Sequence, residues 1–340
     1  MASLRRLLWP ASLLYECGVA SRNLAFLSRI RKRRQLAGRV ISVGNLTVGG
    51  TGKTPMVMWL AERLLAEGKS VGILTRGYGG NTDRKLRWAK ESDEVALLRA
   101  RLPESVMFGV GADRFAKGRE LERAGVEWFL LDDGFQHRQL ARDVDIVLLD
   151  AMDPFGGGLL LPAGKLREPR SALRRASIIM ITRTERAPAI EAVVRRYTNA
   201  PIFYAWTRLR GVFDSASADP RNPALVDFRS RHLYAFCTIG NPSAFFDDLK
   251  RWGFSVAGET IFRDHHRLTQ KDTVELNRRA RAVKADGFIC TEKDLWNDAR
   301  LCASQLPVWV CRMDLQIPDG ERFWQTVGEQ SEHRAARGRE

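Results

Sequence analysis

The residues best suited to chemistry follow an apolar stretch near position 45. Residues 40–54 read VISVGNLTVGGTGKT, so an apolar run enters a glycine-rich turn that ends in Gly-Lys-Thr. Backbone N–H groups of such a turn surround nucleotide phosphates, the lysine reaches the outer two phosphates, and the threonine hydroxyl binds Mg²⁺. The sequence therefore predicts a phosphate-binding loop whose nucleotide-binding residues are Gly49, Gly50, Thr51, Gly52, Lys53 and Thr54.

Two acids after a second apolar run suit a metal ion. Residues 126–131 are strongly apolar and lead into Asp132, Asp133 and a glycine. An acid at the end of a buried strand holds Mg²⁺ in proteins that have a phosphate loop. Two adjacent carboxylates there also need a cation nearby. We therefore predict Thr54, Asp132 and Asp133 as metal ligands, and the sequence leaves open which aspartate touches the ion.

The elements around the loop predict an α/β fold. Pro55 suits the first turn of a helix, apolar residues then recur at helical spacing up to Gly68, and residues 71–74 form the next apolar strand. Strand, helix and strand in this order form a parallel βαβ unit. We predict a P-loop NTPase-like, mainly parallel sheet flanked by helices, with further strands at 126–131, 146–149 and 178–181.

Later residues predict a second, smaller α/β unit. Apolar runs at 234–237, 287–290 and 308–311 are typical of strands, and 243–252 is typical of a helix. Residues 208–230 are polar and contain two prolines, so we expect a connection there. The predicted organisation is an amphipathic basic segment at 1–38, a P-loop core domain at 39–225, a smaller C-terminal α/β lobe at 226–330 and a charged tail at 331–340.

The composition favours an anionic partner. The 340 residues carry a net charge of +15, with a sequence pI of about 10.1, and 44% of them are hydrophobic. Such a charge suits nucleic acid, a phospholipid surface or a phosphorylated substrate. The five cysteines form no Cys-x-x-Cys pair, so neither a zinc site nor a disulfide framework is indicated. A reducing, cytoplasmic environment follows.

The N-terminal segment combines positive charge with apolar side chains. Residues 1–39 hold nine Lys or Arg and a single acid, Glu16, among many leucines and Trp9. Arginines and Pro10 interrupt the apolar residues, so the segment is not a clean membrane span, and it fits a signal peptide poorly. We predict an amphipathic segment in the membrane interface with cations facing anionic lipid. The alternative is a helix packed on the protein's own core with a solvated basic face.

Several short motifs occur in order along the chain: Gly44-Asn45 with GGTGKTP at 49–55, RGYGG at 76–80, SDE at 92–94, DDGFQH at 132–137, LPAGKLREP at 161–169, GNP at 240–242, FRDH at 262–265 and TEKD at 291–294. Their order and spacing together resemble the tetraacyldisaccharide 4′-kinase family of Gram-negative envelope biosynthesis. Two positions depart from the family pattern. Ser92 replaces a usual glycine, and Leu295-Trp296 follows TEKD where a small residue is usual.

The resemblance implies a kinase that moves the γ-phosphoryl of ATP to the 4′-hydroxyl of a tetraacylated glucosamine disaccharide 1-phosphate, forming lipid IVA in lipid A biosynthesis. It implies ATP and Mg²⁺ as cofactors, and the lipid substrate and an anionic membrane surface as partners. We expect no nucleic acid partner, because no recognition helix or aromatic platform is recognisable. The implied location is the cytoplasmic face of the inner membrane, with peripheral or monotopic attachment.

The resemblance also implies catalytic roles. Asp93 would be the general base for the sugar hydroxyl, paired with a histidine that the motif places at His265 rather than His266. Lys53 would bridge the β- and γ-phosphates. The guanidinium of Arg167 matches phosphate oxygens and could stabilise charge on the transferring group, unless it forms only a surface ion pair. The predicted substrate residues are Asn45, Arg76, Tyr78, Glu94 and Glu168.

Two other classes share the phosphate loop. A switch GTPase selects guanine with Asn/Thr-Lys-x-Asp, but the lysine of residues 291–294 comes one place too late. A partitioning-type ATPase motor has similar loops, but it offers no reason for the motifs at Asp93 and His265. The kinase is therefore the preferred interpretation.

Overall fold

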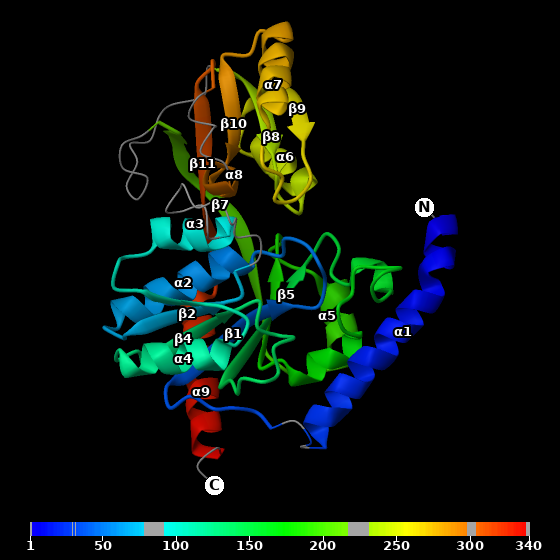
Figure 1. The fold of residues 1–340 in the computed structure, drawn as a ribbon, viewed down its shortest axis with the longest axis vertical. Coiled ribbons are helices and arrows are strands. Elements are labelled where there is room, and N and C mark those ends of the chain that lie inside the picture. Colours follow the sequence, from blue (N-terminus) through cyan, green and yellow to red (C-terminus); the bar gives the residue numbers. More distant parts are fainter. Residues whose placement is uncertain are drawn as a thin grey trace. The chain divides into compact units, whose positions relative to one another are not determined.

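The structure is a computed structural model that describes residues 2–28, 30, 32–77, 92–216, 231–297 and 304–337 (Figure 1). The chain divides into two compact units. The first comprises residues 1–76, 104–206 and 315–340, and the second comprises 77–103 and 207–314. These boundaries differ from the predicted 39–225 and 226–330. The difference arises because helix α3 (Asp93–Arg101) packs on helix α8 (Glu292–Asn297), and because the last helix returns to the first unit.

The first unit is built on a parallel sheet. Its strands are β1 (Arg39–Asn45), β2 (Val71–Thr75), β3 (Met107–Val110), β4 (Trp128–Asp132), β5 (Val144–Asp150), β6 (Ile178–Thr182) and the beginning of β7 (Ile202–Asp214), in the order β3-β2-β4-β1-β5-β6-β7. Strands β2, β5 and β6 are buried along their whole length. Burial on both faces explains why these strands are continuous apolar runs in the sequence. The predicted mainly parallel fold is confirmed.

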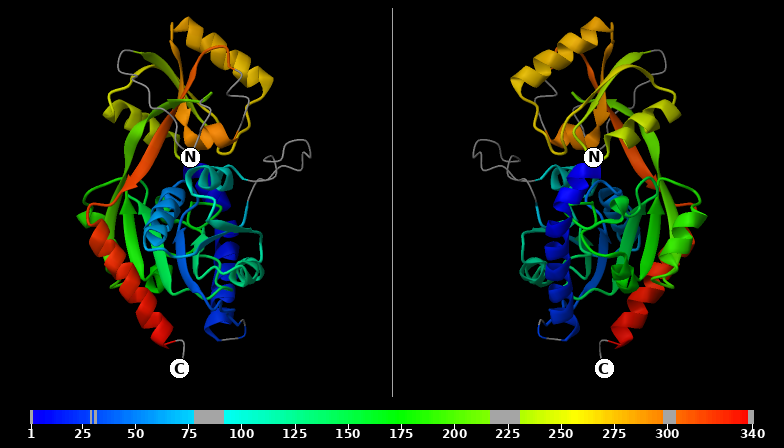
Figure 2. Two further views of the ribbon diagram at one scale, coloured as in Figure 1. Left: turned by 90° about the vertical axis from the view of Figure 1, so that its left-hand side faces the viewer. Right: turned by 90° about the vertical axis from the view of Figure 1, so that its right-hand side faces the viewer.

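Helices cover both faces of this sheet. They are α1 (Ala2–Leu27), α2 (Lys53–Ala66), α4 (Arg114–Arg123), α5 (Pro188–Val194) and α9 (Gly320–Arg337), with 3₁₀ turns η1 (Gly156–Gly158) and η2 (Arg170–Arg175). Helices α1 (blue) and α9 (red) lie at separate positions on the surface of the first unit (Figure 2). Helix α1 continues through Pro10, although a proline inside a helix removes a backbone hydrogen bond and its ring crowds the carbonyl four residues earlier. Tertiary packing of α1 can offset this cost.

The predicted charged tail at 331–340 begins too early. Helix α9 continues to Arg337, and Ser331 is fully buried, with its hydroxyl 3.1 Å from a guanidinium nitrogen of Arg39. Packing explains the difference, because Phe323 and Val327 of α9 are buried on the first unit. The ring of Phe323 lies 5.3 Å from that of Trp59.

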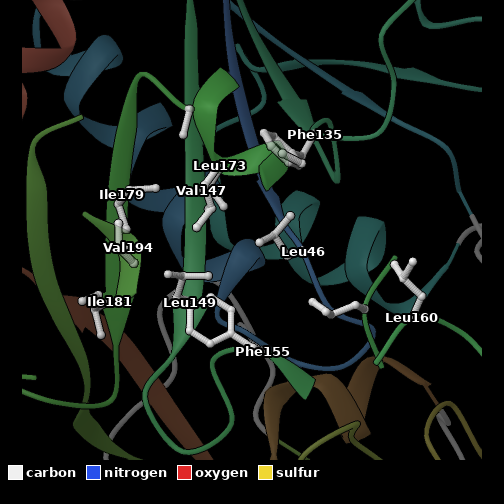
Figure 3. Close-up of a cluster of buried hydrophobic side chains, with 13 residues drawn as sticks. Leu46, Phe135, Val147, Leu149, Phe155, Leu160, Leu173, Ile179, Ile181 and Val194 are labelled. Carbon is white, nitrogen blue, oxygen red and sulfur yellow. The ribbon is translucent and has the colours of Figure 1, made fainter. Parts of the chain in front are cut away.

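A hydrophobic cluster lies beneath the loops that follow β1 and β4 (Figure 3). Leu46 comes directly after β1 and Phe135 shortly after β4, and both side chains are fully buried. They pack with inward-facing residues of β5 and β6, including Val147 and Ile181, and with Val194 of α5. Burial of each such side chain contributes roughly 1.5–3 kcal/mol, so both loops are held firmly to the sheet.

The second unit is a smaller α/β layer. Its elements are α3, the end of β7, β8 (His232–Cys237), α6 (Pro242–Arg251), β9 (Ser255–Ile261), α7 (Gln270–Ala282), β10 (Gly287–Thr291), α8 and β11 (Val308–Gln316). The parallel order is β11-β10-β8-β9. The predicted connection at 208–230 is wrong in its first part, because β7 extends to Asp214, and residues 217–230 lie outside the described residues.

Among the described residues, every helix is too short or too polar to cross a bilayer.

Candidate active site

The predicted phosphate loop connects the end of β1 to the start of α2. Gly52 adopts φ 90°, a left-handed conformation that strains any residue with a side chain, and α2 begins at Lys53. Thr51 is buried, and its hydroxyl accepts a 3.0 Å hydrogen bond from Asn45 Nδ2. Its carbonyl accepts another, at 3.2 Å, from Thr182 Oγ1 of β6. The loop is therefore fixed from two strands, with the N–H groups at the start of α2 available for an anion.

The acidic turn at 132–134 is held against β1. Gly134 N donates to Val43 O at 2.9 Å. A Cβ atom on Gly44 would lie only 2.6 Å from Cβ of Phe135, so this close approach requires glycine. The turn therefore lies beside the start of the phosphate loop. The sequence alone could not show this proximity, because the two segments are far apart in the chain.

Asp133 gathers two cations at this turn. Lys53 Nζ lies 3.5 Å from Asp133 Oδ1, and Arg167 Nη1 donates to both carboxylate oxygens at 2.9 and 2.7 Å. Burial alone would raise the pKa of Asp133, but the charges of Lys53 and Arg167 outweigh it and lower that pKa. The carboxylate therefore stays ionised, and both cations are placed beside the loop.

Backbone pairing positions Arg167. The segment 161–169 lies alongside the phosphate loop, where Val48 N donates to Lys165 O at 2.8 Å and Arg167 N donates to Leu46 O at 2.7 Å. From helix α1, the hydroxyl of Tyr15 donates to the carbonyl of Arg167 at 3.1 Å. The Arg167 side chain is 24% exposed, so it remains accessible to a phosphate.

Two predicted substrate residues are used internally. Glu168 is fully buried, and its carboxylate accepts hydrogen bonds from Arg175 at 2.9 and 3.0 Å and from Asn23 of α1 at 3.2 Å, with Arg22 of α1 3.6 Å away. Asn45 is also fully buried and supports the loop through Thr51. Glu168 therefore anchors α1 to the segment that carries Arg167.

Two further residues join the site. Gln136 Oε1 accepts from Arg167 at 3.4 Å, and its position inside the DDGFQH motif could have indicated this. Arg114, buried on α4, lies 3.2 Å from His137 Nδ1, and no sequence pattern indicated it. Burial and the charge of Arg114 lower the pKa of His137 to about 4, so this imidazole is neutral near pH 7 and accepts from Arg114.

The predicted metal ligands have the chemistry that Mg²⁺ prefers. Asp132 is buried at the end of β4 and accepts from Thr75 Oγ1 at 3.3 Å, and Thr54 is the second residue of α2. Hydroxyl and carboxylate oxygens are hard ligands. Within the described ranges there is no cluster of three or more His, Cys, Asp or Glu side chains that could hold a metal. A phosphate-loop Mg²⁺ needs none, because phosphate and water oxygens complete its shell.

One more predicted residue of the first unit lies at the end of β2. Arg76 directly follows β2 and is exposed. Tyr78 lies outside the described residues.

The second unit carries a carboxylate–imidazole pair. Asp93 is the first residue of α3, and the hydroxyl of Ser92 caps the helix by accepting from Val95 N at 3.4 Å. The Nδ1 atom of His265 lies 3.0 Å from both carboxylate oxygens of Asp93. His266 instead lies 3.0 Å from Asp272. The Asp93 side chain is 4% exposed, whereas His265 is 46% exposed and accessible.

The pair has shifted proton affinities. Burial pushes the pKa of Asp93 upward, but the hydrogen bond with His265 and the charge of Lys293 outweigh it, so the pKa of Asp93 is lowered. The hydrogen bond with Asp93 raises the pKa of His265, against burial and Lys293. Glu94, the next predicted residue, lies 3.5 Å from Lys293 Nζ. A paired carboxylate and imidazole can orient each other and hold a proton.

The parallel sheet, the loop between β1 and α2 and the acidic turn together define a phosphate-loop nucleotide-binding protein. The family model described as tetraacyldisaccharide-1-P 4′-kinase, LpxK, matches residues 4–332. The chain belongs to this family and is therefore a kinase.

Individual relatives agree with this family. Tetraacyldisaccharide 4′-kinase of Pelobacter propionicus is 38% identical over 334 residues, covering 93% of this chain and 90% of that protein. The protein of the same name from Koribacter versatilis is 38% identical, covering 92% and 95%. A solved structure of LpxK from Aquifex aeolicus in complex with ATP has a TM-score of 0.74 and 30% identity, covering 96% of this chain and 99% of that one. Neither the GTPase switch nor the partitioning motor is favoured.

Proposed function

We propose that the chain transfers the γ-phosphoryl of ATP to the 4′-hydroxyl of a tetraacylated glucosamine disaccharide 1-phosphate, which forms lipid IVA. The hydrogen-bonded pair of Asp93 and His265 is the observation that carries this proposal. A protein that only hydrolyses a nucleotide as a switch has no need of a base for a sugar hydroxyl, whereas a sugar kinase does. The names of the relatives support the acceptor, and the ATP complex of the LpxK structure supports the donor.

The first unit would hold the donor. Lys53 and Arg167, which both contact Asp133, can turn their charges to the β- and γ-phosphates, because both side chains are near the loop and partly exposed. Lys53 would bridge the two phosphates, and the Arg167 fork would stabilise charge that grows on the transferring group. When bound, Mg²⁺ would be held by Thr54, Asp132 and Asp133 and would neutralise phosphate charge.

The second unit would activate the acceptor. As the hydroxyl attacks, its proton must leave, and Asp93 would accept it. His265 would orient that carboxylate through the hydrogen bond at Nδ1, and the carboxylate and the imidazole would share a proton. Arg76, Tyr78 and Glu94 remain proposed substrate contacts.

Helix α1 supports attachment to an anionic membrane surface. One face of α1 packs on the first unit through Ser12, Val19 and Phe26, which are buried. The opposite face is apolar and exposed, with Trp9 at 53%, Leu14 at 76% and Leu24 at 64%. Exposed basic residues follow at 32–34. An apolar face beside cations suits the interface of an anionic bilayer, so we propose peripheral attachment at the cytoplasmic face of the inner membrane.

Radiolabelled ATP tests the proposal directly. Purified protein is incubated with labelled ATP and detergent-solubilised disaccharide lipid, and parallel reactions replace ATP with GTP or the lipid with DNA. Label should appear on the lipid, and only with ATP. Nucleotide hydrolysis without labelled lipid would favour the switch or motor and reject the kinase.

A further inference from the structure

The TEKD motif at residues 291–294 has no part in the roles described above. It spans the end of β10 and the start of α8 in the second unit. The carboxyl ends of parallel strands are where open α/β sheets place their functional groups. The contacts of the motif connect it to both members of the Asp93–His265 pair.

Asp294, the last residue of the motif, is fully buried and connects the ends of two strands. One carboxylate oxygen of Asp294 accepts from Thr291 N at 2.9 Å and Thr291 Oγ1 at 2.6 Å. The other accepts from Thr238 N at 2.6 Å and Thr238 Oγ1 at 2.7 Å. These four bonds join the ends of β10 and β8, and a buried carboxylate with four donors is firmly oriented.

These hydrogen bonds continue to the histidine. The carbonyl of Thr238 accepts from His265 N at 2.9 Å. His265 adopts φ 58°, a left-handed conformation that a non-glycine residue holds only when its surroundings impose it. Asp294 therefore fixes the backbone from which His265 reaches Asp93.

The second residue of the motif fixes the helix of the base. Glu292 is buried, and its carboxylate lies 2.7 Å from Arg101 Nη1, in the last turn of α3. Arg101 also contacts Asp314 of β11. A buried, hydrogen-bonded ion pair tolerates little displacement, because moving either partner leaves an uncompensated charge. Helix α3, which begins at Asp93, is thereby anchored beside α8.

The third residue meets the base itself. Lys293 Nζ lies 3.6 Å from Asp93 Oδ2, 3.5 Å from Glu94 Oε1 and 3.7 Å from Asp264 Oδ1. Its side chain is only 20% exposed. One ammonium group thus lies near three carboxylates. The carboxylate of Asp93 contacts both this ammonium group and the imidazole of His265.

We propose that Lys293 is a positioning residue for Asp93, whose carboxylate it holds toward His265 while it balances the charges of Glu94 and Asp264. Glu292 and Asp294 hold Lys293 and His265 in place. This inference rests on the proposed function, in which Asp93 is the base. In this proposal the TEKD motif affects catalysis through the Asp93–His265 pair and does not contact the phosphates.

Electrostatics support this role. The charged groups that face the pair are Glu94 from α3, Asp264 from the loop after β9 and Lys293 from α8. The charge of Lys293 lowers the pKa of both Asp93 and His265. Without it, three carboxylates would share one imidazole, and repulsion would raise both pKa values.

The test compares Lys293→Met with Lys293→Arg, and uses Lys250→Met on the exposed face of α6 as the control. We expect Lys293→Met to lower kcat roughly tenfold at neutral pH and to move the acid limb of the kcat–pH profile upward by about one unit, so that activity recovers at higher pH. The KM for ATP should not change. Lys293→Arg keeps a cation and should keep the acid limb, and Lys250→Met should match the unmodified protein.

A spectroscopic readout separates positioning from mere structure. The imidazole resonance of His265, assigned by its loss in His265→Gln, should titrate at higher pH in Lys293→Met. A uniform loss of kcat, with neither the limb nor the resonance moved, would overturn the proposal. Failure of the proposed function is seen separately, as lipid phosphorylation retained by Asp93→Asn.

Discussion

The Nδ1 atom of His265 is equidistant, at 3.0 Å, from the two carboxylate oxygens of Asp93. The two residues are 172 positions apart in the chain, and the left-handed backbone of His265 is what aims its ring at the start of α3. Such a pair can be tested by removing either partner, because each removal changes a different property of the reaction.

Replacement of Asp93 with asparagine should remove the proton acceptor. The shape of the side chain is kept, so we expect kcat for lipid phosphorylation to fall by roughly 10²–10⁴, while ATP binding measured by calorimetry is unchanged. Asp247→Asn, on the exposed face of α6, is the matched control. Near-normal phosphorylation by Asp93→Asn would reject the base assignment.

The reaction should depend on pH through the same pair. Because the pKa of His265 is raised above its ordinary value of 6.5, the pair keeps its shared proton to higher pH and can accept another only after losing it. We therefore expect kcat to rise with pH along a limb centred above 6.5. In His265→Ala this limb should move down, toward the range of a lone carboxylate, and kcat on the plateau should fall. An unmoved limb would show that another group titrates.

Replacing Lys53 and replacing Arg167, the two cationic residues that contact Asp133, should affect the reaction in different ways. Lys53→Ala should weaken ATP binding and lower turnover, because in the proposed role the lysine contacts phosphates in both the bound and the transition state. Arg167→Lys keeps the charge but loses the fork, so we expect kcat to fall roughly 10²-fold with little change in ATP affinity. Arg174→Lys on η2 is exposed and serves as the control. Equal losses of affinity in both variants would contradict this division.

Membrane attachment can be separated from folding. We expect the triple change Trp9→Ser, Leu13→Ser and Leu24→Ser to reduce co-sedimentation with anionic vesicles more than tenfold, since each buried apolar side chain contributes roughly 1.5–3 kcal/mol. ATP binding should persist, because these side chains face away from the first unit. Val274→Ser, exposed on α7, is the control. Equal sedimentation of the triple variant and the unmodified protein would remove the membrane proposal.

Much of the first unit could be predicted because its parallel strands are buried on both faces. Such strands appear as apolar runs, and β2, β4 and β6 lie close to the predicted ranges. The phosphate loop could be predicted equally well, since its glycines and its lysine follow a strand directly. Strand β9 alternates between exposed and half-buried residues, so it produces no continuous apolar run, and β3 is apolar but has only four residues, too few to stand out from its surroundings.

The site was less predictable where contacts join distant segments. Ser92 looked like a loss of glycine and instead supplies a helix cap. Glu168 looked accessible beside Arg167, yet neighbouring residues in an extended segment point to opposite sides, and only Arg167 faces the loop. A buried polar residue such as Arg114 leaves no local pattern, because its partner His137 lies in another segment of the chain.

The hydrogen bond from Tyr15 to the carbonyl of Arg167, together with the bonds of Ser12 to Leu160 O and Ala163 N at 3.0 Å, gives α1 a second significance. The same helix that exposes tryptophan and leucine, and that we propose to face the membrane, also supports the loop that carries Arg167. Bilayer composition and detergent choice would therefore influence the rate of phosphorylation even for an acceptor that dissolves freely in water.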